Sequence, residues 1–148
     1  MQIVHDHLHH WDAQLPAVAL AVDRLTLAKR RWRGAADDGA EFGFDLEHHL
    51  HDGDVFFQSE AAVYRVVQKP EPVLELRSAE CGVRKGESAR VGWMIGNLHF
   101  ALEVAEESIR VVDDPALRQL FEREGWPFVV REAVFHPLSG GHSHGHSH

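Results

Sequence analysis

The proline-rich stretch KPEP, Lys69 to Pro72, separates two parts of the chain that differ in hydrophobic rhythm. Proline has no backbone N–H and weakens strand pairing, so the strand that precedes this stretch is expected to end there. Before it, apolar residues alternate with period two; after it, segments with helical spacing stand between strand-like ones. The sequence therefore predicts one domain at residues 1–70, a second at residues 71–137 and a flexible tail at residues 138–148.

The first part of the chain has the pattern of an all-β domain. Val18, Leu20 and Val22 alternate with small residues, and the turn signal Asp37–Gly39 stands between two strand-like segments, which predicts a hairpin. A second turn is expected at His51–Asp54. The expected strands after the first one cover residues 25–33, 41–46, 55–57 and 63–68.

The second part alternates strands and helices. Its N-terminal helix is expected at residues 83–95, ending at Gly96-Asn97; the other begins with Asp114 as N-cap and Pro115 as first helical residue, and stops at Gly125. Strands are expected at residues 73–77, 98–104, 109–112 and 127–135. This order of strand, helix, strand, strand, helix, strand predicts a ferredoxin-like domain, and the chain as a whole is expected to be α+β.

Charge and hydropathy exclude several classes of partner. The formal net charge of -8 argues against nucleic acid, because a phosphate-binding face needs many cations. The single basic cluster at residues 28–33 is interpreted as a solvated strand face, with a phosphate or partner patch as the alternative. No segment has the apolar length that spans a bilayer, and the polar N-terminus does not resemble a signal peptide, so a cytoplasmic protein is expected.

Histidine is unusually abundant, with 13 residues in the chain. Imidazole is the commonest transition-metal ligand in proteins, so metal binding is the leading hypothesis. The C-terminal His142, His144, His146 and His148 alternate with serine and glycine, a pattern typical of a flexible metal-binding tail; a purification tag is the alternative. Such a tail has no residues to bury and is expected to be disordered without metal.

His99 is the candidate ligand within the folded part of the chain. If residues 98–104 form a strand, the apolar side chains of Leu98, Phe100, Leu102 and Val104 share one face and His99 points to the other. A single imidazole does not hold a metal tightly, so a functional His99 needs further ligands from the tail or a second subunit. The alternative is an ordinary surface histidine.

The segment GWMIGNLHF, residues 92–100, resembles the motif around the metal-binding histidine of UreE-type urease accessory proteins, which are nickel metallochaperones. The segments KRRWRGAADDGAEFGFDL, DGDVFF and DDPALRQLFEREG, together with the histidine-rich end, are also similar to that family. The resemblance implies a homodimer in which His99 from each subunit holds one Ni(II), with tail histidines helping. It further implies a polypeptide-binding N-terminal domain and delivery of nickel to the urease accessory GTPase and the urease apoprotein assembly complex.

The chain departs from the family pattern in several places. Leu98 replaces the usual arginine, Ala101 replaces the usual proline, and Val112 and Asp114 stand where some members have further histidines. His136, in the segment FHPL, is either a ligand near the tail or a plain surface histidine. Zn(II) or Cu(II) binding is expected in vitro, because imidazole affinity alone does not select nickel. Since imidazole titrates near pH 6.5, metal binding is expected to fall below about pH 6.

Two other histidine groups lie outside the family motifs. His5, His7, His9 and His10 are interpreted as a solvated strand end, although an extended chelating segment is the alternative. His48, His49 and His51 are interpreted as exposed turn residues. The chain has no HExxH, nucleophile elbow or dinucleotide fingerprint, so it is not expected to be an enzyme. Metal storage by the tail and a peptide-binding adaptor remain alternative functions.

Overall fold

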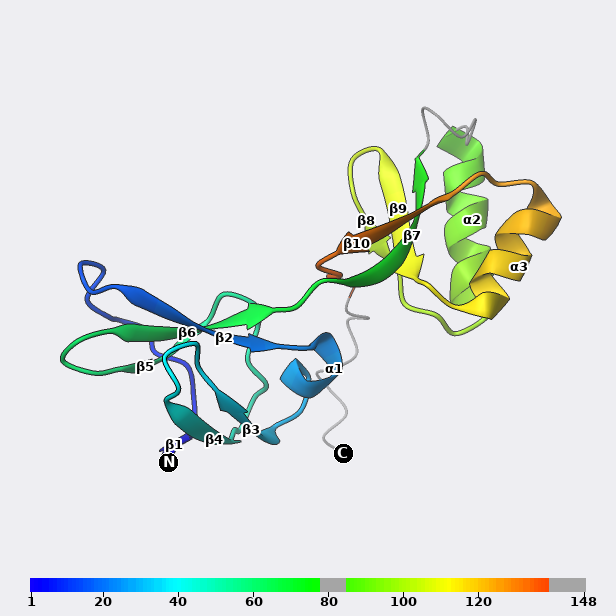
Figure 1. The fold of residues 1–148 in the computed structure, drawn as a ribbon. Coiled ribbons are helices and arrows are strands. Elements are labelled where there is room, and N and C mark those ends of the chain that lie inside the picture. Colours follow the sequence, from blue (N-terminus) through cyan, green and yellow to red (C-terminus); the bar gives the residue numbers. More distant parts are fainter. Residues whose placement is uncertain (78–84, 139–148) are drawn as a thin grey trace. The chain divides into compact units, whose positions relative to one another are not determined.

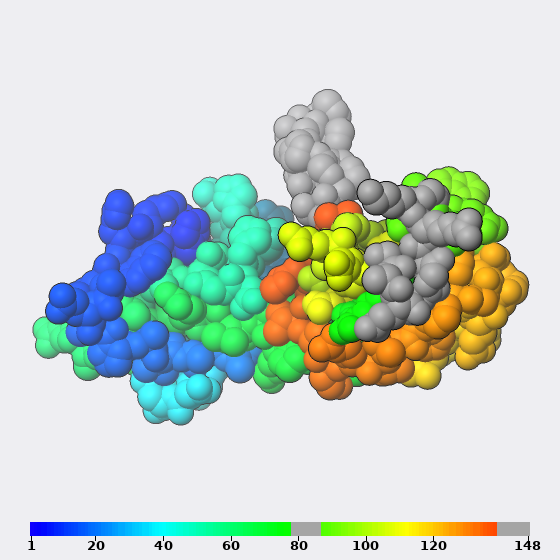
Figure 2. All heavy atoms as spheres, turned by 90° about the horizontal axis from the view of Figure 1, so that it is seen from above, coloured from blue at the N-terminus to red at the C-terminus, as the bar shows by residue number. Residues whose placement is uncertain are grey.

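The computed structural model describes residues 1–77 and 85–138 of the chain (Figure 1). The chain divides into two compact units, Met1–Lys69 and Pro70–His148. Figure 2 draws all heavy atoms as spheres, with the first unit in blue to green and the described part of the second in green to red. The expected tail from Ser139 onward and the expected helix start at Val83 lie outside the described residues.

The N-terminal unit consists of two three-stranded sheets with one short helix. One sheet has the order β1-β4-β3 and the other the order β2-β6-β5. Its elements are β1 (Gln2–Val4), β2 (Ala17–Val22), α1 (Arg24–Leu27), β3 (Arg31–Ala35), β4 (Glu41–Asp45), β5 (Val55–Gln58) and β6 (Val63–Gln68). The expected hairpin is confirmed: β3 and β4 pair antiparallel, and Gly39 in their turn has a φ of 89°.

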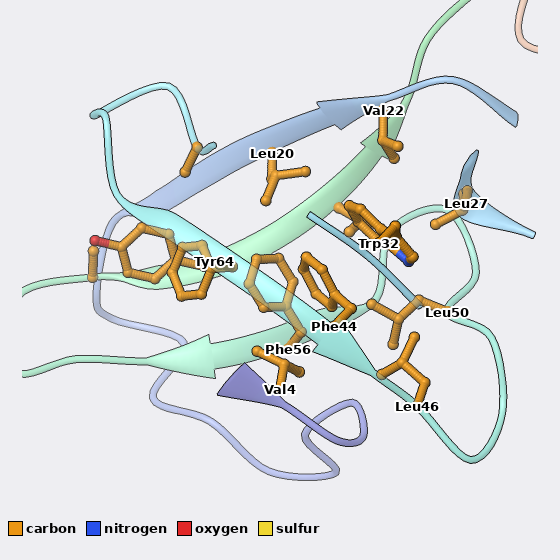
Figure 3. Close-up of a cluster of buried hydrophobic side chains, with 14 residues drawn as sticks. Val4, Leu20, Val22, Leu27, Trp32, Phe44, Leu46, Leu50, Phe56 and Tyr64 are labelled. Atoms are coloured by element: carbon orange, nitrogen blue, oxygen red, sulfur yellow. The ribbon is translucent and has the colours of Figure 1, made fainter. Parts of the chain in front are cut away.

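Aromatic and aliphatic side chains together form the core of this unit (Figure 3). Trp32 of β3 stacks on Phe44 of β4 with ring centroids 3.8 Å apart, and Phe56 of β5 meets Phe44 edge to face at 5.1 Å. Such offset and edge contacts add to the burial of large apolar surfaces. The alternation predicted for β4 thus brings Phe42 and Phe44 into the core, both nearly fully buried.

The expected strand at residues 25–33 is wrong in its first part. Residues Arg24–Leu27 form helix α1, and β3 begins only at Arg31. The carboxylate of Asp23 accepts a hydrogen bond from the backbone N–H of Thr26, which is the bond of a helix N-cap. This local cap overrides the strand preference of the Leu25-Thr26-Leu27 segment, and Leu27 is buried from the helix.

The C-terminal unit has a four-stranded sheet of order β10-β7-β9-β8, in which all neighbouring pairs are antiparallel. Its elements are β7 (Glu71–Arg77), α2 (Lys85–Asn97), β8 (Glu103–Val104), β9 (Ser108–Val112), α3 (Pro115–Glu124) and β10 (Val129–Ala133). Both helices cover the same face of the sheet (Figure 1). Val91 and Ile95 of α2 meet Leu117 and Phe121 of α3 in one buried cluster.

Helix α3 follows its sequence signals closely. Asp114 is the N-cap and its carboxylate accepts from the N–H of Ala116; Pro115 is the first helical residue. Gly125 ends the helix with a φ of 70°, the left-handed conformation that glycine adopts without steric cost. The expected signals for this helix are confirmed.

The face of the sheet opposite the helices contains a buried acid. Glu75 of β7 is 2% exposed, and its carboxylate accepts hydrogen bonds from Arg77 and Arg110 at 2.7 Å and from Arg131 at 3.1 Å. Burial raises the pKa of Glu75, but these three guanidinium groups lower it more, to about 2. The ion cluster therefore joins the three strands β7, β9 and β10 through side chains as well as through backbone pairing.

Candidate metal centre

His99 lies at the C-terminal end of helix α2 and not on a strand. Its N–H donates to the carbonyl of Gly96 at 2.9 Å, and the N–H of Phe100 donates to the carbonyl of Ile95 at 3.4 Å. His99 itself has a φ of 64°. These two bonds around a left-handed residue form a Schellman motif, in which Phe100 and Ile95 make the accompanying apolar contact.

The expected strand at residues 98–104 is therefore wrong, except for β8 at Glu103–Val104. The face assignment made from it is wrong as well, because Leu98 and Val104 are 45% and 57% exposed and do not contribute to a shared core face. The alternating pattern predicted a strand, but helix α2 continues to Asn97 and residues Leu98 to Phe100 form its C-terminal cap. His99 is exposed to solvent because it occupies this cap.

Exposed apolar side chains lie on the same half of helix α2 as His99. Trp93, six residues earlier on α2, is 68% exposed, and Leu98 is 45% exposed. A Cβ added at Gly92 or Gly96 would meet no atom within 4 Å, so this side of the helix is open. Large apolar side chains left in solvent beside small residues are typical of a surface that contacts another molecule.

The left-handed backbone conformation of His99 is expected to reduce the stability of the protein. Histidine is tolerated in the left-handed region but still carries a Cβ that glycine lacks. We expect His99→Gly to raise the free energy of unfolding by about 1 kcal/mol, because the strain at the cap is removed. Urea denaturation of the variant beside wild type measures it. A His99→Val variant is the control and is expected to be less stable than wild type; equal stability of all three proteins would contradict a strained cap.

His136, the other candidate ligand in the described residues, lies beyond the end of β10. Its backbone N–H donates to the Glu103 carboxylate at 3.2 Å, and its Nδ1 lies 3.9 Å from the same oxygen. The side chain is 55% exposed. No described contact joins His136 to His99, and the tail ligands His142, His144, His146 and His148 lie outside the described residues. Across residues 1–77 and 85–138, no three His, Cys, Asp or Glu side chains are placed together to hold a metal ion.

Four histidines of the N-terminal unit form two pairs of neighbouring rings, whereas the sequence predicted separate exposed side chains. The rings of His7 and His9 have centroids 4.5 Å apart, and those of His49 and His51 are 4.8 Å apart. The signal that could have identified both pairs is the His-x-His spacing, because alternate residues of an extended segment point the same way.

The folded chain is thus defined as a two-domain α+β protein with a β-rich first domain and, in its second, an exposed histidine at a helix end. The family model "UreE urease accessory protein, N-terminal domain" matches residues 2–69, and the model "UreE urease accessory protein, C-terminal domain" matches residues 71–148. The chain belongs to the UreE family of urease accessory proteins. Members of this family assist urease and are not themselves enzymes.

Individual relatives give the same result. A "Urease accessory protein UreE" from Pseudomonas fluorescens (strain SBW25) is 32% identical over 135 residues, which cover 89% of this chain and 79% of the relative. One from Chelativorans sp. (strain BNC1) is 32% identical over 135 residues, covering 87% and 83%. In the part of the chain that the model describes, no helix is long and apolar enough to cross a membrane.

Proposed function

We propose that this protein is a nickel carrier for urease maturation, in which His99 from two copies of the chain holds one Ni(II) ion as cargo. The observation that carries the proposal is the position of His99. The Schellman cap fixes its backbone at an exposed helix end, so its imidazole is available to a ligand from outside the chain. Membership of the urease accessory family supplies the physiological setting.

A second copy of the chain supplies the missing ligand in this proposal. A twofold axis beside His99 brings the same residue from both copies together, since each residue of such an interface meets its own equivalent or that of a neighbour. Exposed Trp93 and Leu98 then become buried around the ion, and Gly92 and Gly96 allow the partner backbone to approach closely. Leu98, which stands where the family usually has arginine, contributes apolar area to this contact instead of charge.

The tail histidines His142, His144, His146 and His148 complete or supply the site, with His136 as the candidate nearest the folded domain. Ligands from a flexible segment leave a metal one at a time, so the ion can pass to a partner without a single large barrier. We assign residues 138–148 to this tail and residues 71–137 to a ferredoxin-like domain for metal binding and dimerisation. Ni(II) is the proposed cargo, with Zn(II) or Cu(II) able to compete in vitro.

The proposed partners are the urease accessory GTPase and the urease apoprotein in the cytoplasm. Residues 1–70 are proposed to bind a polypeptide of this machinery. The exposed Met1 and, on β1, Ile3 lie beside Gly43 of β4 and present an apolar strip on that domain suited to such a contact. No nucleic-acid partner is proposed, in keeping with the acidic net charge.

The test is the mass of the full-length protein by light scattering, combined with Ni(II) titration calorimetry on it and on a variant in which the four tail histidines are replaced by glutamine. The expected result is a dimer that binds one tight ion per two chains. A monomer whose nickel binding depends entirely on the four tail histidines would instead indicate metal storage by the tail. A protein that lacks tight metal binding altogether would favour the peptide-binding adaptor.

A further inference from the structure

The segment that carries His7 and His9 is held firmly against the N-terminal unit. The backbone N–H of Leu8, the residue between them, donates to the carbonyl of Val55 at 2.7 Å. On one side of it, Val4 is buried in β1; on the other, the N–H of Asp12 donates to the Gln58 side chain at 2.8 Å. The two rings are therefore presented from a tethered segment.

Asp6 fixes the orientation of the first ring. Its carboxylate lies 3.0 Å from Nδ1 of His7, and it also accepts from the His7 backbone N–H at 2.8 Å. A carboxylate only accepts hydrogen bonds, so a proton on Nδ1 facing Asp6 would leave the Nε2 lone pair for a metal ion. This carboxylate–histidine arrangement is the one that orients histidine ligands in metal sites.

Asp6, His7 and His9 lie within the same short tethered segment, residues 6–9. Asp6, His7 and His9 therefore form one local group, although the three side chains are not arranged around a common point.

The distance between the centroids of the two rings is the one expected for two imidazoles that bind the same metal ion. A metal–imidazole bond of about 2.1 Å places each ring centroid roughly 3.2 Å from the ion. Two neighbouring ligands then have centroids about 4.5 Å apart at a square-planar or octahedral centre and about 5.2 Å apart at a tetrahedral one. The observed 4.5 Å fits the first geometry, which is that of Ni(II) and Cu(II). The two rings stand at 67° to each other, and binding one ion requires both rings to turn a nitrogen toward it.

We propose that His7 and His9, oriented through Asp6, form a second binding site for a divalent transition-metal ion on the N-terminal domain. Water fills the remaining coordination positions, so the site exchanges its ion readily. It goes beyond the proposed function, because it needs neither His99, nor the tail, nor a second copy of the chain. Its role is to bind the same class of metal as the proposed carrier site at a separate place on the molecule.

The experiment uses the full-length chain with His99→Asn and with the four tail histidines replaced by glutamine. In this background we expect one Ni(II) or Cu(II) per chain by titration. Paramagnetic broadening in the NMR spectrum should affect the imidazole signals of His7 and His9 first. The double variant His7→Ala/His9→Ala is expected to lose this equivalent, while the control His10→Ala/His48→Ala, which removes two exposed imidazoles from outside both ring pairs, keeps it.

Asp6→Asn tests the positioning role, because it retains both imidazoles but not the carboxylate. A loss of affinity of roughly 10-fold is expected, with the stoichiometry unchanged. The proposal is overturned if the two double variants bind metal equally, or if broadening affects His49 and His51 before His7 and His9. Either result leaves the His99 carrier site untouched, since His99 is absent from the background.

Discussion

The His99→Asn variant is expected to lose the tight nickel ion, with affinity falling by at least roughly 100-fold, because one substitution removes an imidazole from each copy of the proposed site. Asparagine is chosen because it tolerates the left-handed conformation that His99 adopts in the cap. The helix end is thus retained while the metal ligand is removed. Titration calorimetry with Ni(II) on the full-length protein measures the effect.

Two controls separate loss of the ligand from other causes. His48→Ala removes an exposed imidazole that is remote in sequence from the proposed site and should leave tight binding unchanged. Light scattering should show that His99→Asn is still a dimer, because Trp93 and Leu98 still provide the proposed apolar contact. Retention of one tight ion per dimer in His99→Asn would contradict the assignment of His99 as the ligand.

Glu75→Gln is expected to lower the free energy of unfolding by roughly 3 kcal/mol at pH 7, because breaking a buried ion cluster leaves charges without their partner. Three guanidinium groups from three strands converge on this one carboxylate, which is 2% exposed. The amide keeps the size of the side chain but loses its charge and one acceptor oxygen. Urea denaturation of the variant and of wild type gives the difference.

The pH dependence of protein stability tests the contribution of Glu75 in a second, independent way. The pKa of Glu75 falls from its ordinary 4.5 to about 2 in the folded protein, so the folded state favours the ionised form. Its stabilisation is fully present above about pH 4.5 and is lost as the pH falls toward 2, amounting to roughly 3 kcal/mol. The gap in stability between wild type and Glu75→Gln should therefore shrink across this window.

Glu132→Gln is the matched control, since Glu132 is an exposed acid on β10 of the same sheet. It is expected to change stability by less than about 0.5 kcal/mol, as surface substitutions do. If Glu75→Gln behaved like this control at pH 7, the three arginine contacts would add nothing to stability beyond what water offers.

Sequence reasoning succeeded where several local signals agreed. Around α3, the cap at Asp114, the proline at the first position, the apolar Leu117 and Phe121 and the glycine stop all favoured the same helix, and the structure has it. The β3–β4 hairpin succeeded for the same reason, since alternation in both strands agreed with the turn residues between them. Agreement between independent local signals reduces the number of alternative structures.

It failed where two local patterns overlapped. Residues 98–104 alternate like a strand, yet the preceding helix takes the first three of them into its cap, because the carbonyl groups at a helix end must find donors. Residues 25–27 alternate apolar and polar like a strand, yet one hydrogen bond from the N–H of Thr26 to Asp23 starts a helix there. In both cases, backbone hydrogen bonds stabilise a helix end where the order of apolar and polar side chains predicted a strand.

The sequence by itself determined the alternation of elements along most of the chain, the family motifs and the choice of histidine as the chemical group of interest, because these depend on neighbouring residues. Only the tertiary structure decided which groups meet. The left-handed backbone of His99, the convergence of Arg77, Arg110 and Arg131 on Glu75, and the ring pair of His7 and His9 depend on how a helix ends, how strands pair and where a segment is tethered. Such contacts arise from backbone geometry and from pairing between distant segments, which a local pattern does not encode.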